Sequence, residues 1–282
     1  AYWLMEYHLD GFRFDLMALH DVETMQLIEN VVHRIDPKAL IYGEGWTGGT
    51  TTLRTGDQAN QANISKITAS DGAIGSVAVF NDAIRDGLKG SVFNQTAQGY
   101  ISGAVTKENA TKVIFGLTGG TSTGTSWKVD NAMIINYMSA HDNNTLWDKL
   151  MFSNGSDSVE DRIAMYRFGA AVVMLSKGTP FMLAGEEFLR TKDGDENSYA
   201  SSDDINNLDW EVLQPGTEEY AMMSYYKDLI AIRKLNSFLT DPNVTVEATA
   251  GSDYSIRVKW YKDGATTAMA SGAKLRFRPM SI

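Results

Sequence analysis

The 282-residue sequence contains no cysteine and only five prolines beside 25 glycines. Without cysteine there is no disulfide and no thiolate metal site, and the low proline content excludes a proline-rich disordered chain. No apolar run approaches the roughly 20 residues that a membrane-spanning helix needs, so we expect no membrane span. Because many secreted bacterial proteins also lack cysteine, the compartment stays open between the cytoplasm and the exterior.

Basic residues are also scarce, with 25 Lys and Arg against 35 Asp and Glu and a net charge of −10. Binding to phosphates needs a surplus of Lys and Arg, so this charge argues against a nucleic-acid partner, whereas a neutral partner is compatible with it. The chain begins with Ala1 rather than Met and shows no charged segment followed by an apolar one. We therefore expect it to be the later part of a larger protein. The sequence does not decide the oligomeric state.

Short apolar runs alternate with longer amphipathic stretches, which is the pattern of alternating strands and helices. The predicted strands are residues 11–15, 39–42, 76–80, 133–138 and 179–183. The predicted helices are the stretch capped by Asp21 and ended by Pro37, residues 160–177, and residues 218–235. The clearest long polar loops are residues 45–75, 85–131 and 185–215.

Strands interleaved with helices predict a parallel sheet with both faces covered. Such a sheet is either open and doubly wound or part of a (β/α)8 barrel, and five strands do not close a barrel. If it is a barrel, three strands lie upstream of residue 1. After Pro242, apolar and polar residues alternate, which predicts a small antiparallel β domain. We therefore expect an α/β part at residues 1–240 and part of a β domain at residues 241–282.

The first predicted strand has the sequence Gly-Phe-Arg-Phe-Asp. Side chains alternate across a strand, so Arg13 and Asp15 share one face while Phe12 and Phe14 pack on the other. A guanidinium and a carboxylate on an inward face must pair or be used. Arg13 favours the ionised form of Asp15, and an oriented carboxylate is what a nucleophile on a sugar carbon requires. Asp15 is the candidate nucleophile; the alternative is an ion pair that only stabilises the sheet.

Glu44 ends the next predicted strand, between Gly43 and Gly45. Flanking glycines let a ligand approach the backbone closely, and Trp46 offers an aromatic face on which a sugar can stack. A general acid needs a raised pKa, which a nearby anionic Asp provides. Glu44 is the candidate general acid, and the alternative is an acidic residue in a tight turn.

His141, Asp142 and Asn143 follow the strand predicted at residues 133–138. Asp142 is a candidate third carboxylate, and His141 a candidate donor to substrate hydroxyls. Metal binding is the alternative, but the other histidines lack ligand spacing with His141, so we expect no metal in the site.

Asp15, Glu44 and the His141–Asp142 pair all follow predicted strands, and the active sites of α/β barrels form at the C-terminal ends of strands. Glycoside hydrolysis through an oxocarbenium-like state uses two opposed carboxylates. Adjacent strands permit the separation of about 5–5.5 Å that gives retention of configuration. The residues alone therefore predict a retaining glycosidase.

Four segments in this order resemble the signature segments of the α-amylase superfamily of glycoside hydrolases: residues 11–15, 43–46, 139–143 and 178–187. The resemblance implies that Asp15 is the nucleophile with Arg13 as its partner. It also implies that Glu44 is the general acid/base and that Asp142 stabilises the transition state beside His141. It further implies a (β/α)8 barrel, of which about the last five βα units are present, with the family's first signature segment upstream of residue 1.

Finer matches resemble the type I pullulanases, which are debranching enzymes of this superfamily. They lie in residues 2–21, 142–150 and 197–210, and the resemblance covers about residues 1–236. It implies a double-displacement hydrolysis of α-1,6-glucosidic links in pullulan and in branched α-glucans such as starch and glycogen. The alternatives are a superfamily hydrolase of α-1,4 links and an inactive glucan-binding fragment, because a partial barrel leaves open strand edges.

Further candidates for binding an α-glucan are Tyr199 and Trp210, whose rings offer stacking surfaces, whereas Trp147 is more typical of packing. Asn143 completes the expected set of substrate-binding residues with Arg13, Trp46 and His141. No cofactor is required for this chemistry. Calcium occurs in relatives, and the acidic stretch at residues 193–196 could supply oxygen ligands for a structural ion, although it lacks EF-hand spacing.

Overall fold

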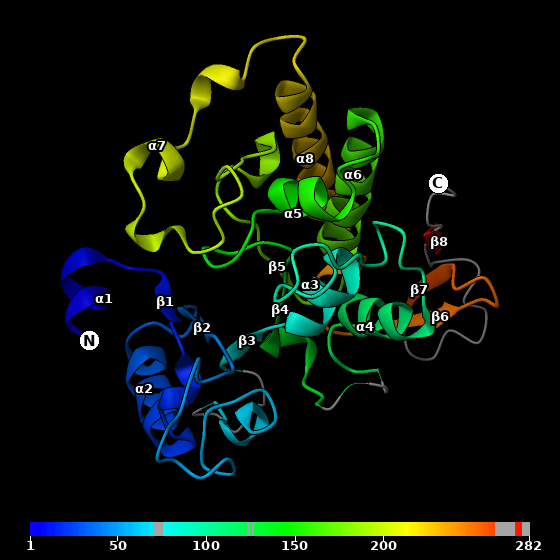
Figure 1. Ribbon diagram of the computed structural model, residues 1–282. Helices are drawn as coiled ribbons and strands as arrows, with labels where there is room; N and C mark the ends of the chain where they lie inside the picture. Colours follow the sequence, from blue (N-terminus) through cyan, green and yellow to red (C-terminus); the bar gives the residue numbers. More distant parts are fainter. Residues whose placement is uncertain (70–75, 123–124, 126, 263–273, 278–282) are drawn as a thin grey trace. The chain divides into compact units, whose positions relative to one another are not determined.

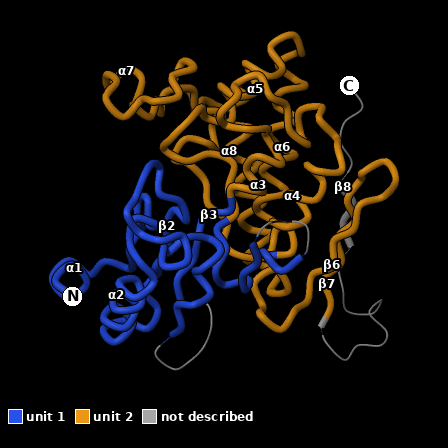
Figure 2. The backbone as a smooth tube through the Cα atoms, turned by 60° about the horizontal axis from the view of Figure 1, so that its bottom comes forward, with its two compact units in different colours: residues 1–81, 119–135 blue, residues 82–118, 136–282 orange. Residues whose placement is uncertain are grey.

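The computed structural model describes residues 1–69, 76–122, 125, 127–262 and 274–277, which Figure 1 draws in sequence colours. The chain divides into two compact units, shown in Figure 2. Unit 1 comprises Ala1–Asn81 and Gly119–Ile135, and unit 2 comprises Asp82–Thr118 and Asn136–Ile282. Each unit is described by itself below.

Unit 1 is built on short parallel strands. Its strands are β1 (Gly11–Phe14), β2 (Leu40–Gly43), β3 (Ala78–Phe80) and the first part of β4 (Ile134–Asn136). Its helices and 3-10 turns are α1 (Tyr2–Tyr7), η1 (Met17–Leu19), α2 (Val22–Ile35), η2 (Ile64–Lys66) and η3 (Asn131–Met133). β1 pairs with β2, β2 with β3 and β3 with β4, each in parallel. The C-terminal ends of these strands therefore meet at one edge.

Helix α2 forms where its capping residue predicts it. The Asp21 carboxylate accepts a hydrogen bond of 2.6 Å from the backbone N–H of Thr24, which lowers the pKa of Asp21. Such a cap satisfies one of the free N–H groups of the first turn. Met25 and Val32, seven residues apart, are buried on one side of the helix. The helix ends before Pro37, which confirms the prediction from sequence.

Unit 2 holds the two longest of the described helices and a second sheet. Its helices are α3 (Asp82–Lys89), α4 (Lys107–Leu117), α5 (Leu146–Ser153), α6 (Val159–Leu175), α7 (Asp203–Asn206) and α8 (Glu218–Leu235). Its strands are β5 (Thr179–Pro180), β6 (Val244–Ala250), β7 (Ile256–Lys262) and β8 (Lys274–Phe277). Its 3-10 turns are η4 (Glu186–Phe188), η5 (Ser198–Ala200), η6 (Trp210–Val212) and η7 (Ser237–Leu239).

Strand β4 continues into unit 2 through Asn136, whose carbonyl accepts a hydrogen bond of 2.8 Å from the N–H of Phe181. The strand order of the first sheet is β1-β2-β3-β4-β5, the sequence order of a βα-repeat sheet. All five strands predicted from sequence are therefore present. β6, β7 and β8 form a separate antiparallel sheet in that order.

The core of unit 2 surrounds α6. This helix buries adjacent residues such as Met165, Tyr166, Val172 and Val173, so its sides are covered all round, as its apolar sequence predicts. The same core includes Trp260 of β7. The division that we expect near residue 240 stays a prediction.

The predicted loop at residues 85–131 is wrong, because it contains the end of α3 and the whole of α4. Thr106 caps α4 by accepting a hydrogen bond of 3.2 Å from the N–H of Asn109. Ala110, Val113 and Leu117 then share a buried face at helical spacing. The described residues of the other two predicted loops hold 3-10 turns, the one-turn helix α7 and an isolated β-bridge from Gln58 to Asp21; residues 70–75 lie outside the description.

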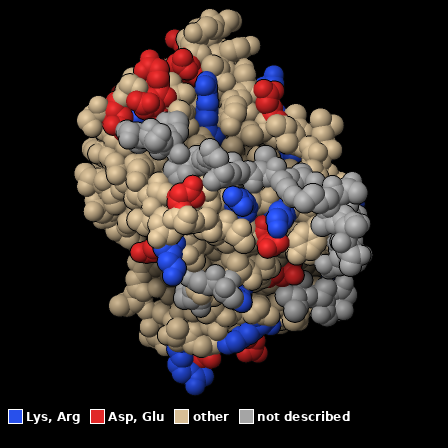
Figure 3. Space-filling model, turned by 90° about the vertical axis from the view of Figure 1, so that its right-hand side faces the viewer, with Lys and Arg blue, Asp and Glu red and all other residues tan. Residues whose placement is uncertain are grey.

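No helix among the described residues is both long enough and apolar enough to cross a membrane. On the face drawn in Figure 3, the coloured basic side chains stand singly or in small groups among acidic ones. They do not merge into one basic patch on that face.

Candidate active site

Unit 1 places two predicted carboxylates at the ends of neighbouring strands. Asp15 follows β1 and Glu44 follows β2, and the register pairs Phe14 with Gly43 directly before them. The N–H of Glu44 donates a hydrogen bond of 3.0 Å to the carbonyl of Phe14, which extends the pairing to the catalytic candidates. Both side chains thus lie at the C-terminal edge of the sheet, where α/β-barrel sites form.

One guanidinium bridges these two carboxylates. Arg13 forms an ion pair with Asp15 through Nη1 and donates a hydrogen bond of 2.8 Å to Glu44 Oε1 through Nη2. Its guanidinium carbon lies 5.7 Å from the centre of the Phe80 ring, within range of a cation–π contact. The predicted contact of Arg13 with Asp15 is present, and sequence reasoning missed its second contact, with Glu44.

The two carboxylates differ in exposure. Glu44 is 3% exposed, whereas the side chain of Asp15 is 61% exposed. Glu44 also accepts a hydrogen bond of 2.8 Å from the N–H of Leu16, so both its oxygens are held. Leu16 has a φ of 44°, an uncommon conformation for a non-glycine residue. Asp15 is therefore open to a ligand while Glu44 is fixed in place.

The glycines around Glu44 serve a purpose other than the predicted one. A Cβ atom at Gly43 would lie 2.6 Å from the carbonyl oxygen of Phe14, and one at Gly45 would lie 2.9 Å from the backbone N of Gln61. The close approach is thus made by the protein itself. Trp46 follows directly and is half-buried.

Unit 2 holds the other predicted residues, in the segment between β4 and α5. His141 Nε2 lies 3.3 Å from Asp142 Oδ1, and their side chains are 51% and 61% exposed. Asn143 has a φ of 62°, in the left-handed region that Asn tolerates better than most residues. The structure therefore brings His141 and Asp142 together on an accessible turn.

Sequence reasoning missed two lysines that hold this turn. Lys192 Nζ donates a hydrogen bond of 2.9 Å to the carbonyl of His141, and Lys89 Nζ donates one of 3.2 Å to the carbonyl of Asn144. Both lysines are buried. Burial lowers the pKa of Lys89 to about 7 and also lowers the pKa of Lys192. No local sequence signal indicates contacts between residues 51 and 55 positions apart.

The two aromatic candidates lie at the surface. Tyr199 is 85% exposed and Trp210 is 59% exposed. The Trp210 ring packs at 5.2 Å from the Phe188 ring, centre to centre, which leaves part of it open. Trp147 packs beside the core and lies 5.9 Å from the guanidinium carbon of Arg162, which agrees with its predicted packing role.

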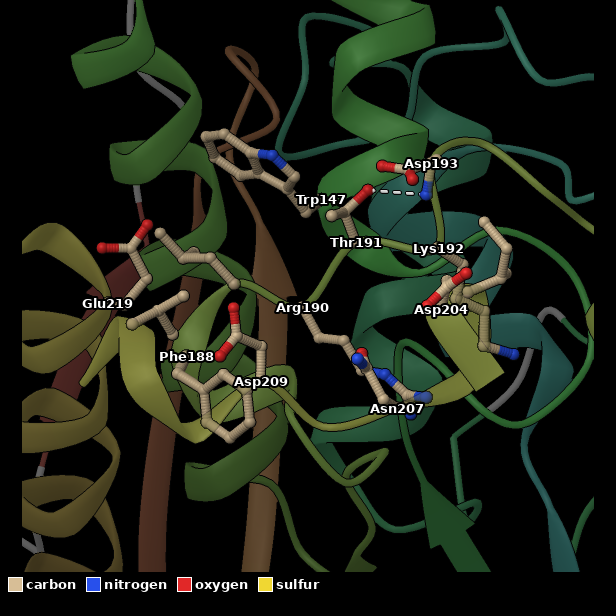
Figure 4. Close-up of a pocket in the computed structure, with 13 residues that line it drawn as sticks. Trp147, Phe188, Arg190, Thr191, Lys192, Asp193, Asp204, Asn207, Asp209 and Glu219 are labelled. Atoms are coloured by element: carbon tan, nitrogen blue, oxygen red, sulfur yellow. Dashed lines mark hydrogen bonds between the residues drawn. The ribbon is translucent and has the colours of Figure 1, made fainter. Parts of the chain in front are cut away.

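A cavity of about 340 Å³ opens beside these segments in unit 2 (Figure 4). Its size falls within the usual range for small-ligand pockets. Trp147 and Phe188 supply aromatic lining, and Asp204 and Asp209 supply carboxylates. Lys192 also lines it, so the lysine that holds His141 reaches the cavity wall. The sequence motifs did not indicate this cavity, because its lining is drawn from separate turns and helices.

Glu186 is a carboxylate buried in unit 2. It is 3% exposed and accepts a hydrogen bond of 2.7 Å from the hydroxyl of Tyr226. Burial raises the pKa of Glu186 to about 7. Its neighbour Glu187 instead accepts a hydrogen bond of 2.9 Å from the N–H of Gly185.

The acidic stretch proposed for calcium already has internal partners. Asp195 accepts hydrogen bonds of 2.5 Å from the Ser201 hydroxyl and of 2.9 Å from the N–H of Asn197. These contacts lower the pKa of Asp195. A calcium site here stays a prediction.

Paired carboxylates at the C-terminal ends of parallel strands are what glycoside hydrolysis on an α/β barrel requires. No protein-family model matches the chain. The chain is 36% identical over 240 residues to the pullulanase of Bacillus subtilis, which covers 83% of this chain and 31% of that protein. It is 30% identical over 258 residues to the chloroplastic pullulanase 1 of Arabidopsis thaliana, which covers 74% of this chain and 26% of that protein.

Solved structures give the same result. The pullulanase of Paenibacillus barengoltzii in complex with maltohexaose and alpha-cyclodextrin matches with a TM-score of 0.81 at 38% identity, covering 92% of this chain and 39% of that one. The pullulanase of Bacillus acidopullulyticus matches with a TM-score of 0.80 at 36% identity, covering 92% and 31%. The chain is therefore a member of the α-amylase superfamily and a homologue of the pullulanases, and it spans about a third of their length. The partial (β/α)8 barrel is confirmed, and an antiparallel β sheet follows it.

Proposed function

We propose that this chain hydrolyses α-1,6-glucosidic bonds in pullulan and branched α-glucans with retention of configuration. The observation that carries the proposal is the bridge from Arg13 to both Asp15 and Glu44. Two carboxylates bound to one guanidinium lie close together, in keeping with the roughly 5–5.5 Å found between the carboxyl groups of retaining enzymes. The homology to pullulanases supports the choice of linkage.

The exposed Asp15 is the nucleophile of this proposal. Its carboxylate attacks the anomeric carbon, and the bond to the glycosidic oxygen breaks as Glu44 transfers a proton to that oxygen. The product is a glycosyl ester on Asp15 and a released sugar hydroxyl. Glu44 then takes a proton from water, whose oxygen attacks the anomeric carbon and frees Asp15, so the two inversions together retain the configuration.

Arg13 aligns the two groups, because its planar guanidinium binds both at fixed angles. Asp142 has the role of stabilising the oxocarbenium-like state, which comes from the family resemblance, and His141 and Asn143 bind sugar hydroxyls. Trp46, Tyr199 and Trp210 offer rings for stacking on glucose units. An α-glucan partner is supported by the maltohexaose bound to the Paenibacillus barengoltzii homologue.

The test is to incubate the purified 282-residue chain with pullulan and measure the release of maltotriose, with amylose as the α-1,4 substrate. We expect maltotriose from pullulan and little cleavage of amylose. Asp15→Asn should abolish release, because the amide is a poor nucleophile. Asp36→Asn, which changes a half-buried carboxylate of unit 1 that accepts a hydrogen bond from the backbone N–H of Lys38, is the matched control and should leave release unchanged.

Failure of the parent chain to cleave pullulan would reject the proposal for this chain. Equal turnover of parent and Asp15→Asn would reject Asp15 as nucleophile. Cleavage of amylose but not of pullulan would show that the chain acts on α-1,4 links instead of α-1,6 links.

A further inference from the structure

The turn that carries His141 and Asp142 is held at both ends through its backbone. The carbonyl of His141 accepts a hydrogen bond from the Lys192 ammonium, and the carbonyl of Asn144 accepts one from the Lys89 ammonium. Asn143, in the left-handed conformation, lies between these two carbonyls. A left-handed backbone conformation at a non-glycine residue persists where the surrounding contacts stabilise it.

Lys192 is itself fixed by a buried carboxylate. Its backbone N–H donates a hydrogen bond of 2.8 Å to Asp148 Oδ2, and the hydroxyl of Thr191 donates one of 2.5 Å to Asp148 Oδ1. Asp148 is 3% exposed and Lys192 is 5% exposed. Asp148 lies in α5, directly after the His141 turn, so the first turn of this helix determines where the lysine sits.

A second contact ties the same two segments together. The side-chain amide of Asn144 donates a hydrogen bond of 3.0 Å to the carbonyl of Gly194. Residues 191–194 therefore contact residues 141–148 through Asp148, His141 and Asn144. A buried ammonium is costly unless it is hydrogen-bonded, and here its bond ends on the residue next to a predicted catalytic carboxylate.

We propose that Lys192 is a positioning residue: its bond to the His141 carbonyl sets where the His141 and Asp142 side chains point. This inference rests on the proposed function for the role of Asp142, but the contact itself belongs to unit 2 alone. Lys192 does not react. It fixes the turn, and the turn presents the two exposed side chains.

The first test reads the position of the turn without turnover. The chain has four histidines, so the imidazole signals in an NMR spectrum can be assigned by His→Gln variants. Lys192→Met keeps the length of the side chain and removes the ammonium. We expect the His141 signal to shift or broaden, with His8, His20 and His33 unchanged, and Lys192→Arg to restore the parent signal.

Lys177→Met is the matched control. Lys177 is also buried in unit 2, and its ammonium also donates to a backbone carbonyl, that of Asp241. Its loss should change thermal stability without moving the His141 signal. An unmoved His141 signal in a folded Lys192→Met chain, or an equal movement in Lys177→Met, would overturn the inference. If Lys192→Met is unfolded by circular dichroism, Lys192→Leu, which also carries no donor, takes its place with the same criteria.

The second test uses pullulan hydrolysis. Misplacement of a catalytic group by about 1 Å can cost on the order of a hundredfold in rate. Lys192→Met should therefore lower kcat about 10- to 100-fold while KM changes less than about threefold, and Lys192→Arg should recover most of kcat. Unchanged kcat in Lys192→Met would overturn the positioning role. A parent chain without turnover would reject the proposed function, and the NMR result would still decide the inference.

Discussion

The two units hold their candidate catalytic groups in different ways. In unit 1, the carboxylates of Asp15 and Glu44 are bound directly by the side chain of Arg13. In unit 2, the side chains of His141 and Asp142 are exposed, and buried lysines bind the backbone of their turn instead. In unit 1 the charged side chains are held by ion pairs. In unit 2 the backbone of the turn is held, and the side chains of His141 and Asp142 stay accessible.

The difference has a physical reason. A nucleophile and an acid must be held at one spacing, and a planar guanidinium provides two binding directions at once. His141 and Asp142 have exposed side chains, and the lysines hold their turn through its carbonyls. Substitutions in unit 1 should therefore act on the chemistry directly, whereas those in unit 2 should act through position.

After the loss of activity expected from Asp15→Asn, the largest effect is expected from Arg13→Met, which removes the bridge between Asp15 and Glu44. We expect kcat/KM for pullulan to fall on the order of a thousandfold, the scale seen when a preorganised electrostatic partner is removed. Arg13→Lys should restore little, because an ammonium cannot bind two carboxylates in the same fork. If Arg13→Met loses no more activity than Lys192→Met does, the difference drawn between unit 1 and unit 2 is wrong.

The next effect concerns the buried carboxyl of unit 2. Since the pKa of Glu186 in the folded chain, about 7, lies above its ordinary value of 4.5, the folded chain holds the proton more tightly than the unfolded chain does. The free energy of unfolding should therefore fall as pH rises from about 4.5 to 7, by at most about 3 kcal/mol. Glu186→Gln keeps an acceptor for Tyr226 and removes the titration.

Urea unfolding at several pH values measures this effect. The free energy of unfolding of Glu186→Gln minus that of the parent should rise between about pH 4.5 and pH 7. Above pH 7 this difference should stay constant. A difference that does not vary with pH would contradict the assignment.

A smaller effect is expected at the tight packing around Glu44. Gly43→Ala places a Cβ against the Phe14 carbonyl, whereas Gly49→Ala meets nothing within 4 Å. Overpacking of this kind costs about 1–3 kcal/mol. Chemical unfolding should show that loss for Gly43→Ala and almost none for Gly49→Ala; equal stability of the two variants would show that unit 1 is less rigidly packed than its geometry indicates.

The smallest effect is expected from Tyr199→Ala. This side chain is 85% exposed, so the free energy of unfolding should change by less than about 0.5 kcal/mol. Loss of a stacking surface should raise KM for pullulan about two- to tenfold and leave kcat unchanged. A lowered kcat with unchanged KM would instead show that Tyr199 acts on the catalytic step and not by stacking on the substrate.

The parts of this molecule that could be predicted from sequence are those with local signals. Alternation along residues 11–15 predicts the contact of Arg13 with Asp15, and the capping residue Asp21 predicts the start of α2. The hydrogen bond from the Lys192 ammonium to the His141 carbonyl has no such signal. The two residues are 51 positions apart, and only the folded chain brings them together. Helix α4 has no clear sequence signal, because it is followed by a glycine-rich stretch and its buried residues do not lie on one face.

The glycines beside Glu44 show a further limit. Sequence predicts that a close approach occurs there, and the structure shows that the approaching atoms belong to Phe14 and Gln61. A missing side chain indicates that space is needed, but it does not say what fills that space.

The most direct measurement is to trap the covalent intermediate. A maltosyl fluoride carrying fluorine at C5 of the reacting sugar forms a glycosyl ester quickly and releases it slowly, so the ester accumulates. Fluoride leaves from C1 and the C5 fluorine stays on the sugar. Peptide mass spectrometry of the treated chain should then find the added fluoromaltosyl mass on Asp15 and on no other carboxylate, and Asp15→Asn should carry none. An ester on another residue, or turnover of pullulan with no ester on Asp15, would contradict the account.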